Sequence, residues 1–198
     1  MNTTLLAKQE LRRALLATRR QLTRMQAISA AEAVATRLRS LPEWQRATRI
    51  GGYRAVGGEI PLTPLCDAAA GTAKIFYYPK IQRLGAGLMW YLPLGGKPLV
   101  ANRYGIPEPN MPVHQAIRPS QLDIILLPLV AFDLTGHRLG MGGGYYDRLL
   151  AGFPATARPL TIGLAHEFQA VDSLPVAHWD HPLDWVITPR RCHDFRSG

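Results

Sequence analysis

The stretch "RLGMGGGYYDRLL", residues 138–150, places four glycines within five positions, directly ahead of a run with the composition of a helix. It follows the apolar run "DIILLPLVAF" (123–132) and the turn-like "DLTGH" (133–137). In α/β proteins a strand, a glycine-rich turn and a helix build an anion site, because glycines let backbone N–H groups approach phosphate oxygens and the helix N-terminus adds positive charge. The stretch predicts a phosphate-binding loop over 140–144 and a helix beginning near Tyr145.

Strand-like segments alternate with helices or loops along the rest of the chain. They cover residues 48–56, 73–79, 87–93, 123–130, 160–165 and 184–188. The segment "IILLPLV" (124–130) is apolar at nearly every position, as expected for a strand covered on both faces. The pattern predicts an α/β fold, an open three-layer α/β/α sandwich with a mainly parallel or mixed sheet. Pro128 is expected at a bulge or strand end, and 64–70 is expected to be a helix with Thr63 as N-cap and Gly71 after its end.

The first 40 residues predict two helices. Residues 3–25 read as a basic amphipathic helix, in which Lys8, Arg12 and Arg19 share one face. Ser29 and Glu32 have the spacing of a capping box, so a second helix is expected from there to about residue 40. The basic face has two simpler interpretations, a solvated helix surface or a mitochondrial presequence. We expect one domain over 1–198, with 1–40 as a helical arm packed on it.

Composition narrows the function classes. The net charge is +9, and 19 of the 23 basic residues are arginine, which favours polyanionic partners such as nucleic acid or phosphates. The two cysteines form no CxxC pair and suit a reducing compartment. Apolar runs stay well below the ~20 residues of a membrane span. A cytoplasmic protein with no membrane contact is predicted.

The glycine loop matches none of the most familiar catalytic motifs. The segment is not GxxxxGK[ST], and it matches GxGxxG only loosely, since Tyr145 stands at the third glycine. GxSxG and HExxH are absent, which argues against serine hydrolases and zinc proteases. A ligand-free strand-to-helix connection is the simpler alternative. The flanking Arg138, Asp147 and Arg148 favour a phosphate site that also holds Mg²⁺.

Taken together, several segments resemble a known enzyme family. These are "FDLTGHRLGMGGGYYDR" (132–148), "KQELR" (8–12), "GGEIPLTPL" (57–65), "NRYGIPEP" (102–109) and "LPVAHWDHPLDWVITP" (174–189). They resemble the 5-formyltetrahydrofolate cyclo-ligases, also called methenyltetrahydrofolate synthetases. The resemblance implies an ATP- and Mg²⁺-dependent ligase that converts 5-formyltetrahydrofolate into 5,10-methenyltetrahydrofolate through an imidate phosphate, releasing ADP and phosphate. It also implies a fold similar to those of sugar-phosphate isomerases and CoA transferases.

The resemblance further implies roles for individual residues. The residues expected to contact ATP are Lys8, Gln9, Glu10, Leu11, Arg12, Arg138, Leu139, Gly140, Met141, Gly142, Gly143, Gly144, Tyr145 and Tyr146. The residues expected to contact the folate are Arg54, Glu59, Met141, Gly142, Gly143, Gly144 and Tyr145. Arg138, Gly142, Gly144 and Tyr145 are the expected catalytic positions, and Asp147 and Asp180 the expected Mg²⁺ ligands.

This sequence departs from the family pattern at two positions. Relatives often carry an apolar residue at the position of Arg54, and many carry arginine at the position of Met141. Two other functions remain open on the sequence alone. A basic nucleic-acid-binding module rests on net charge only, and a phosphosugar or CoA-type enzyme rests on fold analogy only. On the cyclo-ligase interpretation we expect small-molecule substrates, no nucleic-acid partner and a monomer.

Overall fold

The computed structural model describes residues 3–81, 88–91, 99–154 and 158–196. Its main sheet runs in the order β12 (Cys192–Asp194), β11 (Trp185–Ile187), β10 (Leu160–Leu164), β7 (Ile124–Pro128), β1 (Arg49–Gly51), β2 (Ile75–Ile81), β3 (Leu88–Tyr91), β6 (Ala116–Ile117). The strands from β11 to β2 are parallel, and β12, β3 and β6 join antiparallel. The mixed sheet confirms the prediction.

Short elements complete the chain around this sheet. Two small antiparallel ladders pair β4 (Leu99–Ala101) with β5 (Pro107–Pro109) and β8 (Ala131–Phe132) with β9 (Arg138–Leu139). The 3-10 turns are η1 (Val113–Gln115), η2 (Pro119–Gln121) and η3 (Glu167–Gln169). Within the segment expected as a strand over 87–93, residues 87, 92 and 93 lie outside the described part of the chain.

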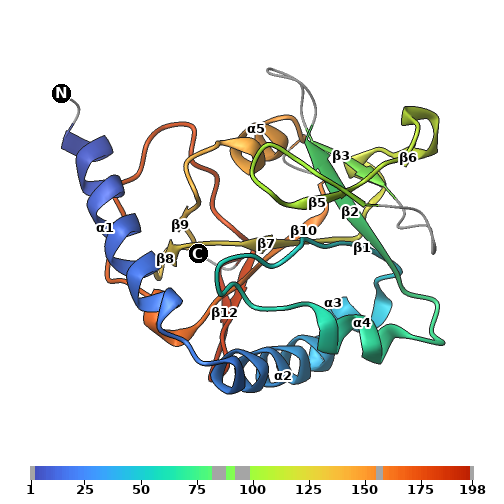
Figure 1. Ribbon diagram of the computed structural model, residues 1–198, viewed down its shortest axis with the longest axis horizontal. Helices are drawn as coiled ribbons and strands as arrows, with labels where there is room; N and C mark the ends of the chain where they lie inside the picture. Colours follow the sequence, from blue (N-terminus) through green and yellow to red (C-terminus); the bar gives the residue numbers. More distant parts are fainter. Residues whose placement is uncertain (1–2, 82–87, 92–98, 155–157, 197–198) are drawn as a thin grey trace.

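Helices cover both faces of the sheet, as Figure 1 shows. On one face, α2 (Arg24–Ser40), α3 (Pro42–Arg46) and α4 (Thr63–Ala69) share a buried cluster with Ile124 and Leu126. On the other face, α5 (Tyr145–Ala151) shares a second cluster with Ile125 and Leu127. Alternate residues of β7 thus enter opposite cores, which explains why the strand is apolar throughout. Pro128 ends this strand, in agreement with the prediction.

The N-terminal helix α1 (Thr3–Arg20) lies at one edge of the molecule (Figure 1). Its apolar residues Leu11, Leu15 and Leu16 pack on a small buried cluster that includes Val130 and Leu139. These residues therefore place the helix against the β8–β9 ladder that leads into the glycine loop. Across the described residues, the helices are all too short or too polar to cross a membrane.

Three predicted helix boundaries are wrong. The first helix ends at Arg20 and the second begins at Arg24, because Thr23 is its N-cap. Thr23 Oγ1 accepts from Gln26 N at 3.2 Å, while Gln26 Oε1 accepts from Thr23 N at 2.8 Å. Thr23 and Gln26 have the same spacing as Ser29 and Glu32 but come earlier, so Ser29 lies inside α2.

The third wrong boundary concerns the helix at 64–70. Thr63 is its first residue rather than its N-cap, and Leu62 takes the N-cap position without a side-chain hydrogen bond. The Cys66 amide donates to the Leu62 carbonyl at 2.9 Å, which starts the helix one residue earlier. Gly71 follows the helix with φ +76°, in agreement with the predicted stop.

The corrected start of α2 is testable. Thr23→Ala is expected to lower the free energy of unfolding by about 1 kcal/mol, because the Gln26 amide at the helix start loses its side-chain acceptor. For a chain of this size that corresponds to a melting temperature lower by about 2–4 °C. Ser29→Ala is the matched control, since Ser29 is exposed inside the helix. Calorimetry showing a larger loss for Ser29→Ala than for Thr23→Ala would contradict this cap.

The order of the parallel strands locates the functional end of the sheet. Counted along the chain, the five parallel strands lie in the spatial order 2-1-3-4-5, so the connections change direction between β1 and β7. In open α/β sheets, ligands bind outside the carboxyl ends of the strands at such a switch point. The segments that leave β1 and β7 there are 52–62 and 129–130.

Candidate functional site

The glycine loop turns sharply between β9 and α5. Gly142 has φ +92° and Gly144, the N-cap of α5, has φ +65°. Both values lie in the left-handed region that favours glycine. A Cβ on Gly143 would lie 2.7 Å from the Tyr145 ring, and a Cβ on Gly144 would lie 2.7 Å from Arg148 Nη1. The positive φ values account for glycine at 142 and 144, and a Cβ at 143 would require the Tyr145 ring to shift.

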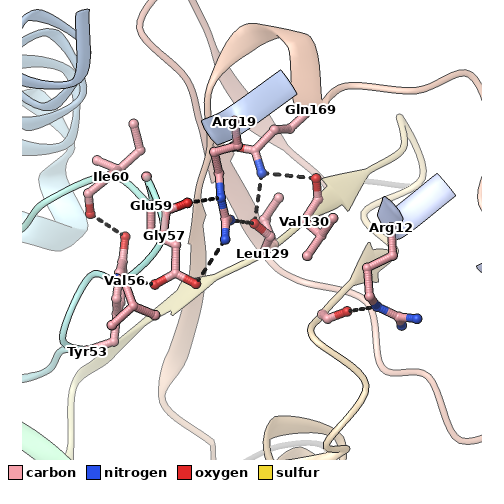
Figure 2. Close-up of polar contacts among 12 residues, drawn as sticks. Arg12, Arg19, Tyr53, Val56, Gly57, Glu59, Ile60, Leu129, Val130 and Gln169 are labelled. Carbon is pink, nitrogen blue, oxygen red and sulfur yellow. Dashed lines mark hydrogen bonds and ion pairs between the residues drawn. The ribbon is translucent and has the colours of Figure 1, made fainter. Parts of the chain in front are cut away.

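Two cations of α1 reach this loop and its surroundings. Arg12 Nε donates to the Gly140 carbonyl at 2.8 Å (Figure 2), and its guanidinium lies beside Gly142. Lys8 Nζ forms an ion pair with Asp180 Oδ2 at 2.5 Å. Burial lowers the pKa of Arg12, but an arginine stays protonated at neutral pH. The predicted basic face thus contacts the body of the protein and is not simply a solvated helix surface.

Arg138 connects the loop region with both expected metal ligands. Its side chain is 4% exposed, Nη2 lies 2.6 Å from Asp147 Oδ1, and Nη1 donates to the His181 carbonyl at 2.7 Å. Burial lowers the pKa of Arg138, and the nearby carboxylates of Asp147 and Asp180 raise it. Asp147 remains 28% exposed at its side chain. Arg138 therefore pairs with Asp147 and lies within electrostatic range of Asp180.

A group of tyrosine and arginine side chains also borders the loop. The Tyr145 hydroxyl accepts from Arg103 Nη2 and lies 3.1 Å from the Tyr104 hydroxyl. These hydrogen bonds, that of Tyr104 first, lower the pKa of Tyr145. Arg148 Nη2 donates to the Gly143 carbonyl at 2.9 Å and its guanidinium lies 5.1 Å from the Tyr145 ring centroid. The 102–104 turn thus approaches the loop from the segment before β5.

Glu59 lies in the connection after β1 and is buried, with 7% of its surface exposed. Its Oε2 accepts from Val56 N at 3.1 Å, and Oε1 lies 3.7 Å from Arg19 Nη2 (Figure 2). Burial raises the pKa of Glu59, and these two contacts oppose that rise. The Glu59 charge also raises the pKa of Tyr146, so the connection lies near the first turn of α5.

Other expected site residues lie apart from this group or face solvent. Arg54 lies over the Tyr78 ring, 4.3 Å from its centroid, and its buried Nε has no hydrogen-bond partner among the described residues. Gln9 and Glu10 are exposed on α1. Leu11 and Leu139 pack together with the small cluster under α1. Met141 is 60% exposed at the tip of the loop.

Three residues organise the site through contacts that the sequence did not predict. Arg19 and His166 hold the connection that carries Glu59, and Arg148 holds the Gly143 carbonyl. The spacing of Lys8, Arg12 and Arg19 on one helix face was the available signal for Arg19. The two glycines before Glu59, with φ +56° and +83°, indicated a tight turn at that point.

The carboxylates suit a magnesium ion that is held largely by a phosphate ligand. The described residues contain no group of three or more His, Cys, Asp or Glu side chains able to hold a metal ion. Mg²⁺ prefers oxygen donors and is usually bound by one or two carboxylates together with substrate phosphates and waters. Asp147 and Asp180 offer such oxygens. Asp133 does not, because its two oxygens accept from the amides of Thr135, His137 and Leu174.

Comparison with known proteins identifies relatives over nearly the whole chain. The family model of the 5-formyltetrahydrofolate cyclo-ligase family matches residues 5–189. The 5-formyltetrahydrofolate cyclo-ligase of Escherichia coli is 37% identical over 178 residues, covering 89% of this chain and 97% of the relative. The enzyme of the same name from Haemophilus influenzae is 35% identical, covering 89% and 94%.

The fold is also similar to that of a solved structure. The 5,10-methenyltetrahydrofolate synthetase of Aquifex aeolicus superposes with a TM-score of 0.81 at 34% identity, covering 96% of this chain and 94% of that one. With a family match across residues 5–189 and relatives above 30% identity over most of their length, this chain belongs to the 5-formyltetrahydrofolate cyclo-ligase family of enzymes.

Proposed function

We propose that the enzyme converts 5-formyltetrahydrofolate into 5,10-methenyltetrahydrofolate, using ATP and Mg²⁺ and releasing ADP and phosphate. The observation that carries the proposal is the meeting of three parts at one end of the sheet. They are the glycine loop with Arg12, the Arg138–Asp147 ion pair, and the buried carboxylate of Glu59. This combination offers donors for phosphate, oxygen donors for a metal and an acceptor for an organic substrate. We also expect a cytoplasmic monomer.

The chemistry explains why the site needs no protein nucleophile. The oxygen of a formyl amide is a poor leaving group, so transfer of the γ-phosphoryl group of ATP to that oxygen would produce an activated imidate phosphate. N10 of the folate then attacks the formyl carbon, the carbon–oxygen bond breaks, and phosphate leaves while the N10 proton passes to solvent. Such catalysis depends on positioning and charge stabilisation.

The residues of the loop suit the ATP phosphates. The amides of the loop are donors for phosphate oxygens, and Lys8 and Arg12 supply positive charge from α1. Because α5 has only seven residues, the side-chain cations carry more of this task than a helix dipole. Mg²⁺ held by Asp147 and Asp180 would neutralise charge on the transferred phosphoryl group. Lys8 and Arg138 balance those carboxylates in the protein alone.

The folate is assigned to the side of the loop where Glu59 lies. A buried carboxylate is a strong acceptor for the amino-pyrimidine edge of a pterin, which presents several N–H donors. Glu59 lies near Tyr146 in the first turn of α5, next to the glycine loop, so the folate would approach the phosphates of ATP at this loop. Arg54 and Met141 remain folate contacts predicted from the resemblance alone.

A direct assay tests the proposed function. The purified protein is incubated at neutral pH with ATP, Mg²⁺ and 5-formyltetrahydrofolate, and the strongly absorbing methenyl product is followed together with ADP. We expect one ADP per methenyl group formed, and no product when any one component is omitted. Absence of product in the complete mixture would refute the proposal. Salt-sensitive nucleic-acid binding without folate-dependent ATP turnover would instead favour the alternative based on charge.

The α1 cations provide a test of the phosphate side. Lys8→Ala combined with Arg12→Ala is expected to raise the Michaelis constant for ATP by about 10-fold, or 1.4 kcal/mol, because two charges that face the phosphates are lost. The constant for 5-formyltetrahydrofolate should change by less than about 2-fold. Arg13→Ala is the matched control, because Arg13 is exposed on the same helix. Equal changes for both substrates, or the same change in the control, would contradict the assignment.

A further inference from the structure

Arg19 is an arginine of α1 that lies in the interior of the protein. Only 3% of its surface is exposed, whereas Arg13 and Arg20 on the same helix are exposed. A buried guanidinium has to find acceptors for its five N–H groups. Arg19 Nε donates to the Gly57 carbonyl at 2.8 Å, and Nη1 donates to the Leu129 carbonyl at 3.2 Å. Figure 2 shows the guanidinium between these two segments.

The two acceptor carbonyls, those of Gly57 and Leu129, lie in the segments that follow the two strands at the switch point of the sheet. Gly57 lies in the connection that leaves β1, and Leu129 directly follows β7. Gln169 Nε2 also donates to the Leu129 carbonyl, at 2.8 Å, and so holds the same peptide from the other side. Arg19 therefore links the two segments that diverge where ligands bind in folds of this kind.

The same arginine shapes the turn that carries Glu59. A Cβ on Gly58 would lie 2.9 Å from the Arg19 carbonyl oxygen and 3.0 Å from Arg19 Cγ. His166 Nε2 lies 2.9 Å from the Gly58 carbonyl, and this ring nitrogen must carry the proton, because a carbonyl only accepts. Arg19 and His166 thus hold the two carbonyls that immediately precede Glu59.

Arg19 also meets the Glu59 side chain directly. Their side chains are 2% and 6% exposed, and Nη2 lies 3.7 Å from Oε1. The other charged or titratable groups around this carboxylate come from three elements. They are Tyr53 after β1, Tyr146 of α5 and His166 after β10. Of these groups, Arg19 is the one with a permanent positive charge, so it favours the ionised carboxylate that a folate would contact.

We propose that Arg19 is the positioning residue of the folate site, which holds the Gly57–Glu59 turn in place and keeps the Glu59 carboxylate ionised toward the substrate. The inference rests on the proposed function, in which Glu59 contacts the folate. Arg19 itself touches neither substrate in this scheme. It acts through Glu59, and its role differs from that of Lys8 and Arg12, which serve the phosphate side from the same helix.

The proposal is tested with two variants of the buried residue, Arg19→Gln and Arg19→Lys. Arg20→Ala is the exposed control. Arg19→Gln is expected to raise the Michaelis constant for 5-formyltetrahydrofolate by about 10-fold or more, as expected when a contact group is misplaced, while that for ATP stays within about 2-fold. Without Arg19, burial raises the pKa of Glu59 further. The Michaelis constant of Arg19→Gln for 5-formyltetrahydrofolate should therefore fall as the pH rises through the raised pKa of Glu59. Arg19→Lys should partly restore the wild-type pH dependence of the Michaelis constant for 5-formyltetrahydrofolate, because lysine keeps the positive charge. It should not restore the full affinity, because lysine lacks the planar guanidinium group that donates several hydrogen bonds.

The outcomes separate this inference from the proposed function. If the wild type makes no methenyl product, the proposed function fails, and with it the basis for the role of Arg19. If the wild type is active and Arg19→Gln keeps the wild-type folate constant and pH profile, the positioning role is refuted. If melting shows that Arg19→Gln does not fold, Arg19→Lys provides the test. A wild-type Michaelis constant for 5-formyltetrahydrofolate in Arg19→Lys would then overturn the proposal. Combining Arg19→Gln with Glu59→Gln should abolish the pH dependence.

Discussion

Asp147→Asn is expected to lower turnover by at least about 100-fold, the scale lost when one preorganised electrostatic group is removed from a transition state. Asparagine keeps the shape of the side chain but removes the charge that would hold Mg²⁺ beside the phosphates. Asp147 is well suited to this role, because Arg138 fixes its Oδ1 at 2.6 Å while more than a quarter of the side chain stays exposed. Raised Mg²⁺, or Mn²⁺ in its place, should partly restore turnover.

Melting has to be measured with the turnover, because Asp147 also has a structural partner. Removing its charge leaves the buried Arg138 with only neutral hydrogen-bond acceptors among the described residues, the amide oxygen of the substituted side chain and the His181 carbonyl. We expect a loss of stability of about 1–2 kcal/mol, below the range for a fully buried pair because Asp147 is partly exposed. Asp172→Asn is the matched control, an exposed aspartate in the loop after η3.

Normal turnover of Asp147→Asn at low Mg²⁺ would contradict the metal role. Asp147 would then serve only to pair with Arg138 in the first turn of α5. The metal site would have to be sought around Asp180, whose Oδ2 accepts from the Ala177 amide at 2.8 Å and meets Lys8. Asp133 would not replace it, because the surrounding turn uses both of its oxygens.

The sheet was predictable because a strand that is buried on both faces has a continuous run of apolar residues in the sequence. A strand such as β7 must be apolar at successive positions, since Ile124 and Ile125 enter different cores. Helix starts were less predictable. Two capping-box patterns lie six residues apart in the same segment, and their spacing alone does not show which of them starts the helix. Edge strands such as β12 and β6 are short, and their residues lack this pattern.

The glycine loop was predictable for a related reason. Positive φ values at Gly142 and Gly144 restrict these positions to glycine, so the backbone course appears directly in the composition. The side chains that contact the loop cannot be predicted from its composition. Arg12 and Arg19 share one helix face, but a solvated basic face has the same spacing, so the sequence does not show which acceptors they meet. Their acceptors lie far along the chain, 128 residues away for Arg12 and 110 for the Leu129 carbonyl at Arg19.

Glu59→Gln is expected to weaken the binding of 5-formyltetrahydrofolate by about 10- to 150-fold, which corresponds to a charged hydrogen bond of about 1.5–3 kcal/mol. Glutamine has nearly the same size, but its amide replaces one acceptor oxygen by a donor and removes the charge. ATP binding should stay within about 2-fold, because the glycine loop and its cations are unchanged. Glu32→Gln, at an exposed position on α2, is the matched control.

The pH dependence gives this prediction a definite sign. Burial raises the pKa of Glu59 above its usual value, so the wild-type carboxylate gains a proton as the pH falls through that raised pKa and loses its ability to accept two hydrogen bonds. Folate affinity of the wild type should therefore fall toward acid pH, whereas that of Glu59→Gln should be low and nearly constant. Calorimetric titrations of each ligand at several pH values measure both effects. Equal weakening of ATP and folate, or an unchanged acid fall in the variant, would show that Glu59 supports the fold around Arg19 and does not contact the folate.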